Sequence, residues 1–245
     1  MLKSTINTTL NYSPNFDVKK RKSSQIKFII FHYTGMKKEK DAIDRLTNPK
    51  SKVSCHYLIK NNGEIITLVP DLYISWHAGI SYWKNYSFIN KYSIGIEISN
   101  PGHNYRYKKF SINQISSILK LSRFLINKYK IKSKFILGHS DIAPDRKKDP
   151  GEKFPWEYLS KRKVGYWHKI ENSELIKNRN KRVEKIEKKI FFKNLFKIGY
   201  HNYYTNNNSK NFSKLVKAFQ RRFRQELVNG IIDKECLNIS KSLIK

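Results

Sequence analysis

The chain has 245 residues, which is enough for one domain of ordinary size and a small second one. Its 50 Lys and Arg residues outnumber 19 Asp and Glu residues, giving a formal net charge of +31 at pH 7. A field of this sign favours anionic partners such as nucleic acid, membrane surfaces or wall polymers. The basic residues are scattered, however, and Lys, Asn, Ile and Tyr are abundant together, as in an AT-biased genome. The composition therefore argues against a specific nucleic-acid-binding protein and leaves the origin of the charge open.

The cysteines and the N-terminus bear on the class of protein and its compartment. Cys55 and Cys236 lie in neither a CxxC motif nor a Cys–His cluster, so we expect no disulfide framework and no structural zinc knuckle. Residues 1–25 lack the apolar stretch and cleavage site of a signal peptide. No window approaches the ~20 apolar residues of a membrane span. We therefore expect a cytoplasmic protein with no transmembrane segment, the alternative being the periplasm or cell envelope after removal of an export signal.

The first half of the chain predicts strands and a helix after a polar start. Residues 1–25 are predicted to form an irregular arm. The nearly continuous apolar run Ile26–Tyr33 then predicts a buried strand, and Lys37–Leu46 predicts a short helix. Ser54–Lys60 and Glu64–Val69 flank an Asn-Asn-Gly turn, which indicates a β-hairpin.

Alternation of strands and helices continues to about residue 165. Ser93–Ser99 predicts a strand with three isoleucines on one face, and Ile112–Tyr129 has the apolar spacing of an amphipathic helix. Phe135–Leu137 predicts a short strand, followed by the charged loop Ser140–Pro155. We therefore predict an α/β domain over residues 26–165, with a mixed central sheet flanked by helices.

The C-terminal part has a different composition. Residues 166–189 are strongly charged and predict a linker or a solvated helix. Residues 190–245 then predict a small three-helix bundle. One of its helices carries an apolar stripe formed by Phe212, Leu215, Val216, Phe219 and Phe223.

Polar residues with metal-binding potential stand at the ends of predicted strands. His32 ends the run FIIFH and His139 ends FILGH, while Asp149 lies ten residues further on. Two imidazoles and one carboxylate form a set that zinc accepts in catalytic sites, where a fourth position is left for water. Spacing alone does not single these three out from the other histidines and acids of the chain.

A family resemblance does single them out. The strings FHYTG, SCHYLI, WHAG, SIGIEISNPG and GHSDIAPDRKKDPG together resemble the zinc N-acetylmuramoyl-L-alanine amidases of the amidase-2 family, in particular their AmiD and AmpD branches. The match covers about residues 26–156, with the motifs in family order. The family shares its fold with phage T7 lysozyme and the peptidoglycan recognition proteins, so the resemblance implies that fold.

The resemblance implies a role for five residues. His32, His139 and Asp149 would bind one zinc ion per chain. Glu97 would be the general base, and Lys147 would stabilise the oxyanion that develops on the substrate. The strand pattern agrees, because Glu97 projects from the face opposite three isoleucines. The alternative is that Glu97 and Lys147 form a buried ion pair.

Four further residues are candidates for substrate binding: His56, Trp76, His77 and Asn100. His56 matches a recurrent family histidine that would support the site. Its neighbour Cys55 stands where phage-type relatives carry a tyrosine, which leaves the base role to Glu97. His77 would lie in the substrate groove, Trp76 could stack on sugar or peptide, and Asn100 could bind the stem peptide. Each of the four also has a structural interpretation, as a core or turn residue.

The string KLVKAFQRRFRQELVNGIIDKE resembles the three-helix peptidoglycan-binding domain of many wall hydrolases. The alternative is an amphipathic helix packed on the catalytic domain. Taken together, the resemblances imply a monomeric amidase that hydrolyses the bond between the N-acetylmuramoyl or 1,6-anhydro-N-acetylmuramoyl residue and L-alanine. The alternative function is a non-catalytic peptidoglycan recognition protein. Whether intact murein or a muropeptide is preferred stays open.

Overall fold

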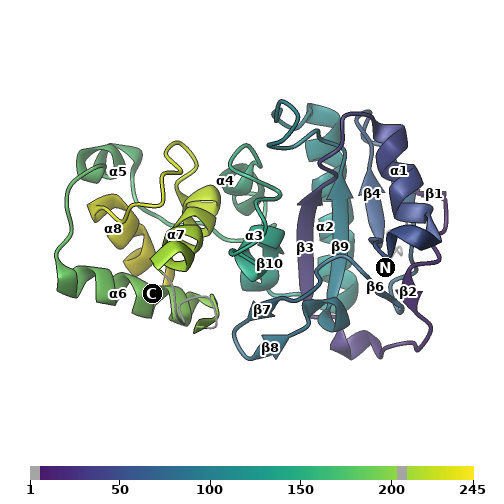
Figure 1. The fold of residues 1–245 in the computed structure, drawn as a ribbon, viewed down its shortest axis with the longest axis horizontal. Coiled ribbons are helices and arrows are strands. Elements are labelled where there is room, and N and C mark those ends of the chain that lie inside the picture. Colours follow the sequence, from purple (N-terminus) through teal and green to yellow (C-terminus); the bar gives the residue numbers. More distant parts are fainter. Residues whose placement is uncertain (1–5, 203–208) are drawn as a thin grey trace.

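The computed structural model describes residues 6–202 and 209–245, and a six-stranded sheet lies at the centre of its first part (Figure 1). The strand order is β1-β5-β4-β9-β3-β10. All neighbouring strands are parallel except β4 and β5, which form the predicted hairpin. The strands are β1 (Thr9–Leu10), β3 (Phe28–Tyr33), β4 (Tyr57–Ile59), β5 (Ile65–Thr67), β9 (Ser93–Ile98) and β10 (Ile136–Gly138). The mixed sheet confirms the predicted α/β class.

Helices and two short ribbons complete the structure. The ribbons pair β2 (Phe16–Asp17) with β6 (Ile74–Ser75) and β7 (Tyr82–Trp83) with β8 (Tyr86–Ser87). The helices are α1 (Glu39–Thr47), α2 (Ile112–Tyr129), α3 (His139–Ile142), α4 (Trp156–Ser160), α5 (Asn172–Asn178), α6 (Lys185–Ile198), α7 (Ser209–Phe223) and α8 (Lys234–Leu243). None of the helices in the described ranges is long and apolar enough to cross a membrane.

One face of the sheet packs against α2. Alternate residues of β3 and β9, which include Ile29, Phe31 and Ile96, form one buried cluster with Leu121 and Leu125 of the helix. The helix begins at a capping box and ends at Tyr129, and the next residue, Lys130, has a left-handed backbone with φ 55°. We refer to this surface of the sheet as the α2 face.

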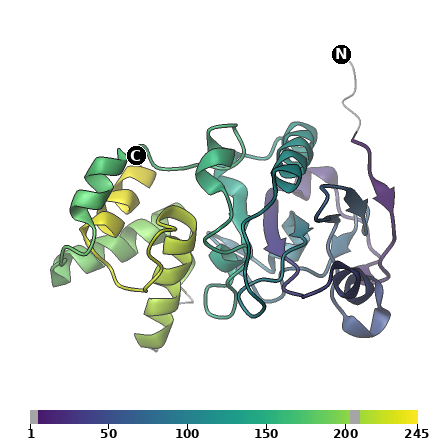
Figure 2. The same ribbon diagram turned by 90° about the horizontal axis from the view of Figure 1, so that it is seen from above.

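The opposite face is covered at its two ends by different elements. Near β4 and β5, Leu58 packs with Leu46 of α1. Near β3 and β10, Phe28, Ile30 and Leu137 share one buried cluster with residues of α6, α7 and α8. Figures 1 and 2 show these C-terminal helices grouped beside the β10 edge of the sheet. We call this contact between the C-terminal helices and the sheet the junction.

The junction contains a buried ion pair as well as apolar side chains. Arg222 of α7 is 1% exposed, and its Nη1 lies 2.7 Å from Asp141 Oδ2 in α3. Tyr200 donates a hydrogen bond to the other oxygen of Asp141, at 2.7 Å. Trp83 of β7 is fully buried and packs edge-on against Tyr200, with an angle of 66° between the ring planes. The predicted C-terminal helices are therefore packed on the part of the chain that contains the sheet.

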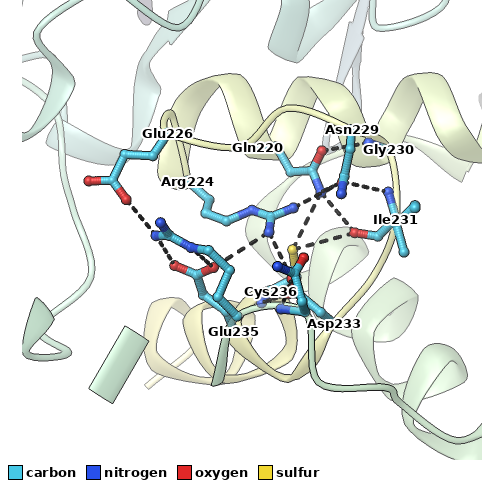
Figure 3. Close-up of polar contacts among 11 residues, drawn as sticks. Gln220, Arg224, Glu226, Asn229, Gly230, Ile231, Asp233, Glu235 and Cys236 are labelled. Carbon is cyan, nitrogen blue, oxygen red and sulfur yellow. Dashed lines mark hydrogen bonds and ion pairs between the residues drawn. The ribbon is translucent and has the colours of Figure 1, made fainter. Parts of the chain in front are cut away.

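A polar network fixes the connection between α7 and α8 (Figure 3). Arg224 is buried and pairs with Asp233 at 2.8 Å, while Gln220 donates a hydrogen bond to the Ile231 carbonyl at 2.8 Å. Gly230 has φ 80°, which favours glycine, and its N–H is bonded to Gln220. Asp233 caps α8 by accepting a hydrogen bond from the Cys236 N–H.

The segment expected to be an irregular arm and the segment expected to be a linker or a solvated helix both contain ordered elements. The N-terminal arm carries β1, β2 and the 3-10 turn Ser23–Gln25, and β1 pairs with β5. The charged segment 166–189 contains α5 and the first turn of α6. Its Arg179 forms an ion pair with the buried Glu235 of α8, at 2.7 Å. The boundaries predicted for the domains stay predictions.

Candidate metal centre and catalytic cleft

Neighbouring parallel strands bring the three predicted ligands together. His32 lies in β3, and His139 begins α3 immediately after β10, which pairs with β3. Their Nδ1 atoms are 2.9 Å apart, and each lies 3.0 Å from Oδ2 of Asp149. All three side chains are buried. The loop after α3 therefore places the Asp149 carboxylate beside the two histidines, near the C-terminal ends of β3 and β10.

This cluster fits a metal ion with nitrogen and oxygen ligands. One atom from each residue converges within 4.8 Å of the others. Burial and the neighbouring His139 lower the pKa of His32 to about 4, which keeps its imidazole neutral. Although burial opposes ionisation of Asp149, the adjacent His139 and His32 hold its pKa well below the ordinary value. Neutral imidazole and ionised carboxylate are the forms that bind a metal. Zinc accepts this donor set.

Glu97 stands beside the cluster because of strand register. It pairs with His32 across β9 and β3, so the two side chains project from the same face. Its Oε2 is buried and has no hydrogen-bond partner among the described residues. Burial, together with the charge of Asp149, raises the pKa of Glu97 to about 8, while Lys147 and Arg45 act in the opposite direction. The carboxyl group is thus suited to taking up and releasing a proton near neutral pH.

The cluster opens into a cleft of about 600 Å³ whose walls come from α1, the segment around Trp76 and the loop before Asp149. Glu97, His139 and Asp149 line its floor. Four cationic side chains also line it, namely Arg45, Arg146, Lys147 and Lys148. The cleft is therefore polar and positively charged around an acidic residue and a potential metal site.

Cys55 and His56 are buried beneath the cleft. Burial raises the pKa of the Cys55 thiol well above its ordinary value, so this group keeps its proton. His56 Nδ1 accepts the Gly95 N–H at 3.0 Å, and its Nε2 lies 3.0 Å from Arg21. Neither residue is among those lining the cleft. The supporting role of His56 stays a prediction.

The other predicted substrate-binding residues have different environments. Trp76 lines the cleft, with its indole N–H bonded to Asp17 at 2.7 Å. His77 also borders the cleft, but it is 8% exposed. Asn100 is 5% exposed and uses its side chain within its own turn, accepting the Gly102 N–H and donating to the Lys108 carbonyl.

Several residues at the site were missed from the sequence. Asn90 accepts hydrogen bonds from the N–H groups of His77 and Ala78, and Arg146 donates to the Ala78 carbonyl at 2.6 Å. Asp141 accepts the Gly138 N–H at 2.8 Å and so fixes the start of α3, which carries His139. No local pattern marks Asn90, whose partners lie 12 and 13 residues away, and the charged partner of Asp141, Arg222, lies 81 residues away.

Comparison with known proteins identifies the family of the chain. The profile of the amidase-2 family, described as N-acetylmuramoyl-L-alanine amidase, matches residues 22–152. The chain is 31% identical to the N-acetylmuramoyl-L-alanine amidase AmiD of Escherichia coli K12 over 235 residues, which cover 90% of this chain and 83% of AmiD. It is 40% identical over 105 residues to the 1,6-anhydro-N-acetylmuramyl-L-alanine amidase AmpD of the same organism, covering 43% of this chain and 55% of AmpD.

Solved structures extend the likeness beyond the profile match. The E. coli AmiD complex with anhydro-N-acetylmuramic acid-L-Ala-D-γ-Glu-L-Lys superposes with a TM-score of 0.79 at 31% identity, covering 90% of this chain and 89% of that one. AmpDh3 from Pseudomonas aeruginosa superposes with a TM-score of 0.78 at 26% identity, covering 99% of this chain and 98% of that one. The chain belongs to the amidase-2 family of N-acetylmuramoyl-L-alanine amidases.

Proposed function

We propose that this protein is a zinc-dependent enzyme that hydrolyses the amide bond between the N-acetylmuramoyl residue, or its 1,6-anhydro form, and L-alanine of peptidoglycan stem peptides. The observation that carries the proposal is the convergence of His32, His139 and Asp149 beside the buried carboxyl group of Glu97. A non-catalytic recognition protein would have no use for a carboxyl group with a raised pKa next to a metal site.

His32, His139 and Asp149 would hold one zinc ion per chain. When bound, zinc supplies Lewis-acid chemistry that polarises the scissile carbonyl and makes water a nucleophile near neutral pH. Glu97 takes a proton from the attacking water and delivers it to the leaving nitrogen of L-alanine. Lys147 places a positive charge in the cleft where negative charge develops on the carbonyl oxygen.

The charge of the cleft supports a peptidoglycan fragment as substrate. The stem peptide carries carboxylates beyond the scissile bond, and Arg45, Arg146 and Lys148 add positive charge to the cleft walls. Trp76 offers an aromatic surface beside them. Two expectations stay predictions with their own measurements: a monomer, by sedimentation velocity, and the compartment, by fractionation of the native host.

The proposal is tested with variants that distinguish the loss of a metal ligand from the loss of the general base. Asp149→Ala should lose both zinc and amidase activity, since two imidazoles hold the ion weakly. Glu97→Gln should keep one zinc per chain and lose ~10²–10⁴-fold in rate. Asp145→Ala, in the same loop but outside the cluster, is the matched control and should keep both. Zinc content is measured by elemental analysis and turnover by release of the stem peptide.

Three outcomes would contradict the proposal. Activity that survives complete removal of zinc by a chelator would rule out the metal mechanism. Wild-type protein that binds muropeptides and zinc but never releases a peptide would favour the recognition protein. Loss of zinc from Glu97→Gln would overturn the separate roles of ligand and base.

A further inference from the structure

In each histidine ligand, the ring nitrogen that points away from Asp149 also has a hydrogen-bond partner. Each imidazole directs Nδ1 toward Asp149, so Nε2 is the far nitrogen. His32 Nε2 lies 3.0 Å from His77 Nδ1, and His139 Nε2 lies 3.2 Å from the Ala78 carbonyl oxygen. The two acceptors are consecutive residues of one segment, Trp76–Gly79.

We infer that Trp76–Gly79 is a shared acceptor segment for both histidine ligands, and that His77 is a positioning residue that fixes which nitrogen of His32 is free to bind the metal. The inference rests on the proposed metal centre. It differs from a substrate-binding role for His77, because it uses both ring nitrogens within the protein. A histidine ligand generally donates its second N–H to such a partner, which orients the ring.

The hydrogen bonds of Ser93 decide which atom donates and which accepts between His77 and His32. The Ser93 hydroxyl donates to the Ile89 carbonyl at 2.7 Å, so its oxygen accepts the N–H of His77 Nε2 at 3.0 Å. A neutral imidazole has one N–H, which leaves His77 Nδ1 as an acceptor. His32 therefore donates from Nε2, and its Nδ1 lone pair faces Asp149. With the opposite direction, His32 Nδ1 would carry a proton and could not be a ligand.

The strand β9 is built to hold this arrangement. Ser93, Gly95 and Glu97 alternate on one face of it. A Cβ at Gly95 would lie 2.4 Å from Cγ of His77, so only glycine leaves room for the ring. The same face thus provides the end of the hydrogen-bond chain, the space for His77 and the proposed base.

The backbone of the acceptor segment is held from two directions. Asn90 Oδ1 accepts the His77 and Ala78 N–H groups at 3.2 and 2.7 Å. The Ala78 carbonyl also accepts from Arg146 at 2.6 Å. Displacement of this segment would therefore alter the orientation of both histidine ligands together.

The test compares His77→Leu with His77→Asn. Leucine removes the acceptor, whereas the Oδ1 of asparagine can occupy the place of Nδ1. The zinc dissociation constant, measured by competition with a chromogenic chelator, should rise 10–100-fold in His77→Leu and only a few-fold in His77→Asn. His168→Leu, which replaces a buried histidine away from the cleft, is the matched control and should leave the zinc dissociation constant unchanged. Circular dichroism checks that each variant is folded.

A second measurement does not depend on variants that replace His77. In metal-free protein with ¹⁵N-labelled histidine, NMR couplings should show His32 as the Nε2–H tautomer. Ser93→Ala should reduce this preference and weaken zinc binding a few-fold. Equal zinc affinity in wild type and folded His77→Leu, with only KM raised, would overturn the inference and favour substrate binding. A wild-type His32 protonated at Nδ1 would overturn it as well. Wild-type protein that binds no zinc would instead contradict the proposed metal centre.

Discussion

The α2 face and the junction both bury large apolar side chains of the same sheet, but they differ in what else they contain. On the α2 face, β3 and β9 pack against α2 in a cluster of mainly aliphatic and aromatic residues that also includes Trp156 and Leu159 of α4. At the junction, an apolar cluster of similar kind surrounds the ion pair between Arg222 and Asp141. Asp141 also fixes the start of α3, where His139 lies. The α2 face therefore stabilises the sheet alone, whereas the junction stabilises the sheet and supports a proposed metal ligand.

This difference affects how the C-terminal helices should be understood. A domain that only tethers the enzyme to the wall needs few contacts with the catalytic part. Here Phe28, Ile30 and Leu137 of the sheet share one buried cluster with residues of α6, α7 and α8, so removing these helices would take away part of that cluster. Wall binding by residues 190–245 stays a prediction, and the packing adds a structural role that does not depend on it.

The largest effect is expected from removing the junction. A chain that ends at Asn180 should unfold at a much lower temperature than the full chain and lose activity on every substrate, because part of its core is gone. Calorimetry and cleavage of soluble muropeptides measure the two effects. A truncated chain that keeps its melting temperature and cleaves muropeptides normally, but no longer sediments with murein sacculi, would indicate a tethering domain instead.

Breaking the ion pair alone should have the next largest effect. Arg222→Met leaves Asp141 buried without its charged partner and should lower the free energy of unfolding by about 3–5 kcal/mol. Lys214→Met, on the exposed side of the same helix, is the control and should change it by less than about 0.5 kcal/mol. Urea denaturation measures both. Equal stabilities would show that the pair is dispensable to the junction.

The sequence predicted the α2 face better than the junction, for a physical reason. The strands and α2 have periodic apolar residues, so the sequence predicted these elements and placed His32 and His139 at strand ends, whereas the choice of His32, His139 and Glu97 as site residues came from the family resemblance. The buried Arg222 could not be predicted, since an arginine in a helix is usually exposed and its partner Asp141 lies 81 residues away.

The same reasoning explains what was missed in the site itself. The motifs of the family located the candidate ligands and the base, but the partners of those ligands are set by tertiary contacts. His77 and Ala78 carry no local sign that they face the far nitrogens of His32 and His139. Pairing of β1 with β5 joins residues more than fifty positions apart, so the N-terminal arm gave no strand signal.

Glu97 lies on the sheet face opposite α2, between the end covered by α1 and the end covered by the C-terminal helices. Its raised pKa predicts how the stability of the protein changes with pH. The pKa of this carboxyl group is about 8 in the folded protein against an ordinary 4.5, so the unfolded state releases the proton first. Stability that the protonated group provides at low pH is therefore lost as pH rises from about 4.5 to about 8. Glu97→Gln avoids this loss.

In metal-free protein, Glu97→Gln should become more stable than wild type across that range of pH. The difference between the two free energies of unfolding should be on the order of 2 kcal/mol at pH 8, a value that allows for partial screening by solvent. Denaturation of both proteins at pH 4.5, 6 and 8 measures it. A difference that does not depend on pH would mean that Glu97 titrates normally and that its environment is more hydrated than the buried Oε2 suggests.

The smallest effect is expected at the start of α2, and it tests whether the α2 face depends on local structure. Ser111 Oγ accepts the Gln114 N–H at 3.1 Å, and Gln114 in turn accepts the Ser111 N–H at 3.0 Å and donates to the Ser99 carbonyl at 2.8 Å. Ser111→Ala should lower the free energy of unfolding by about 1 kcal/mol, because an N-terminal N–H of the helix loses its partner. Ser116→Ala, at an exposed position inside the same helix, should be neutral or slightly stabilising, since alanine has the higher helix propensity. If both variants behave alike in urea denaturation, the capping box contributes nothing and α2 is held by its apolar stripe alone.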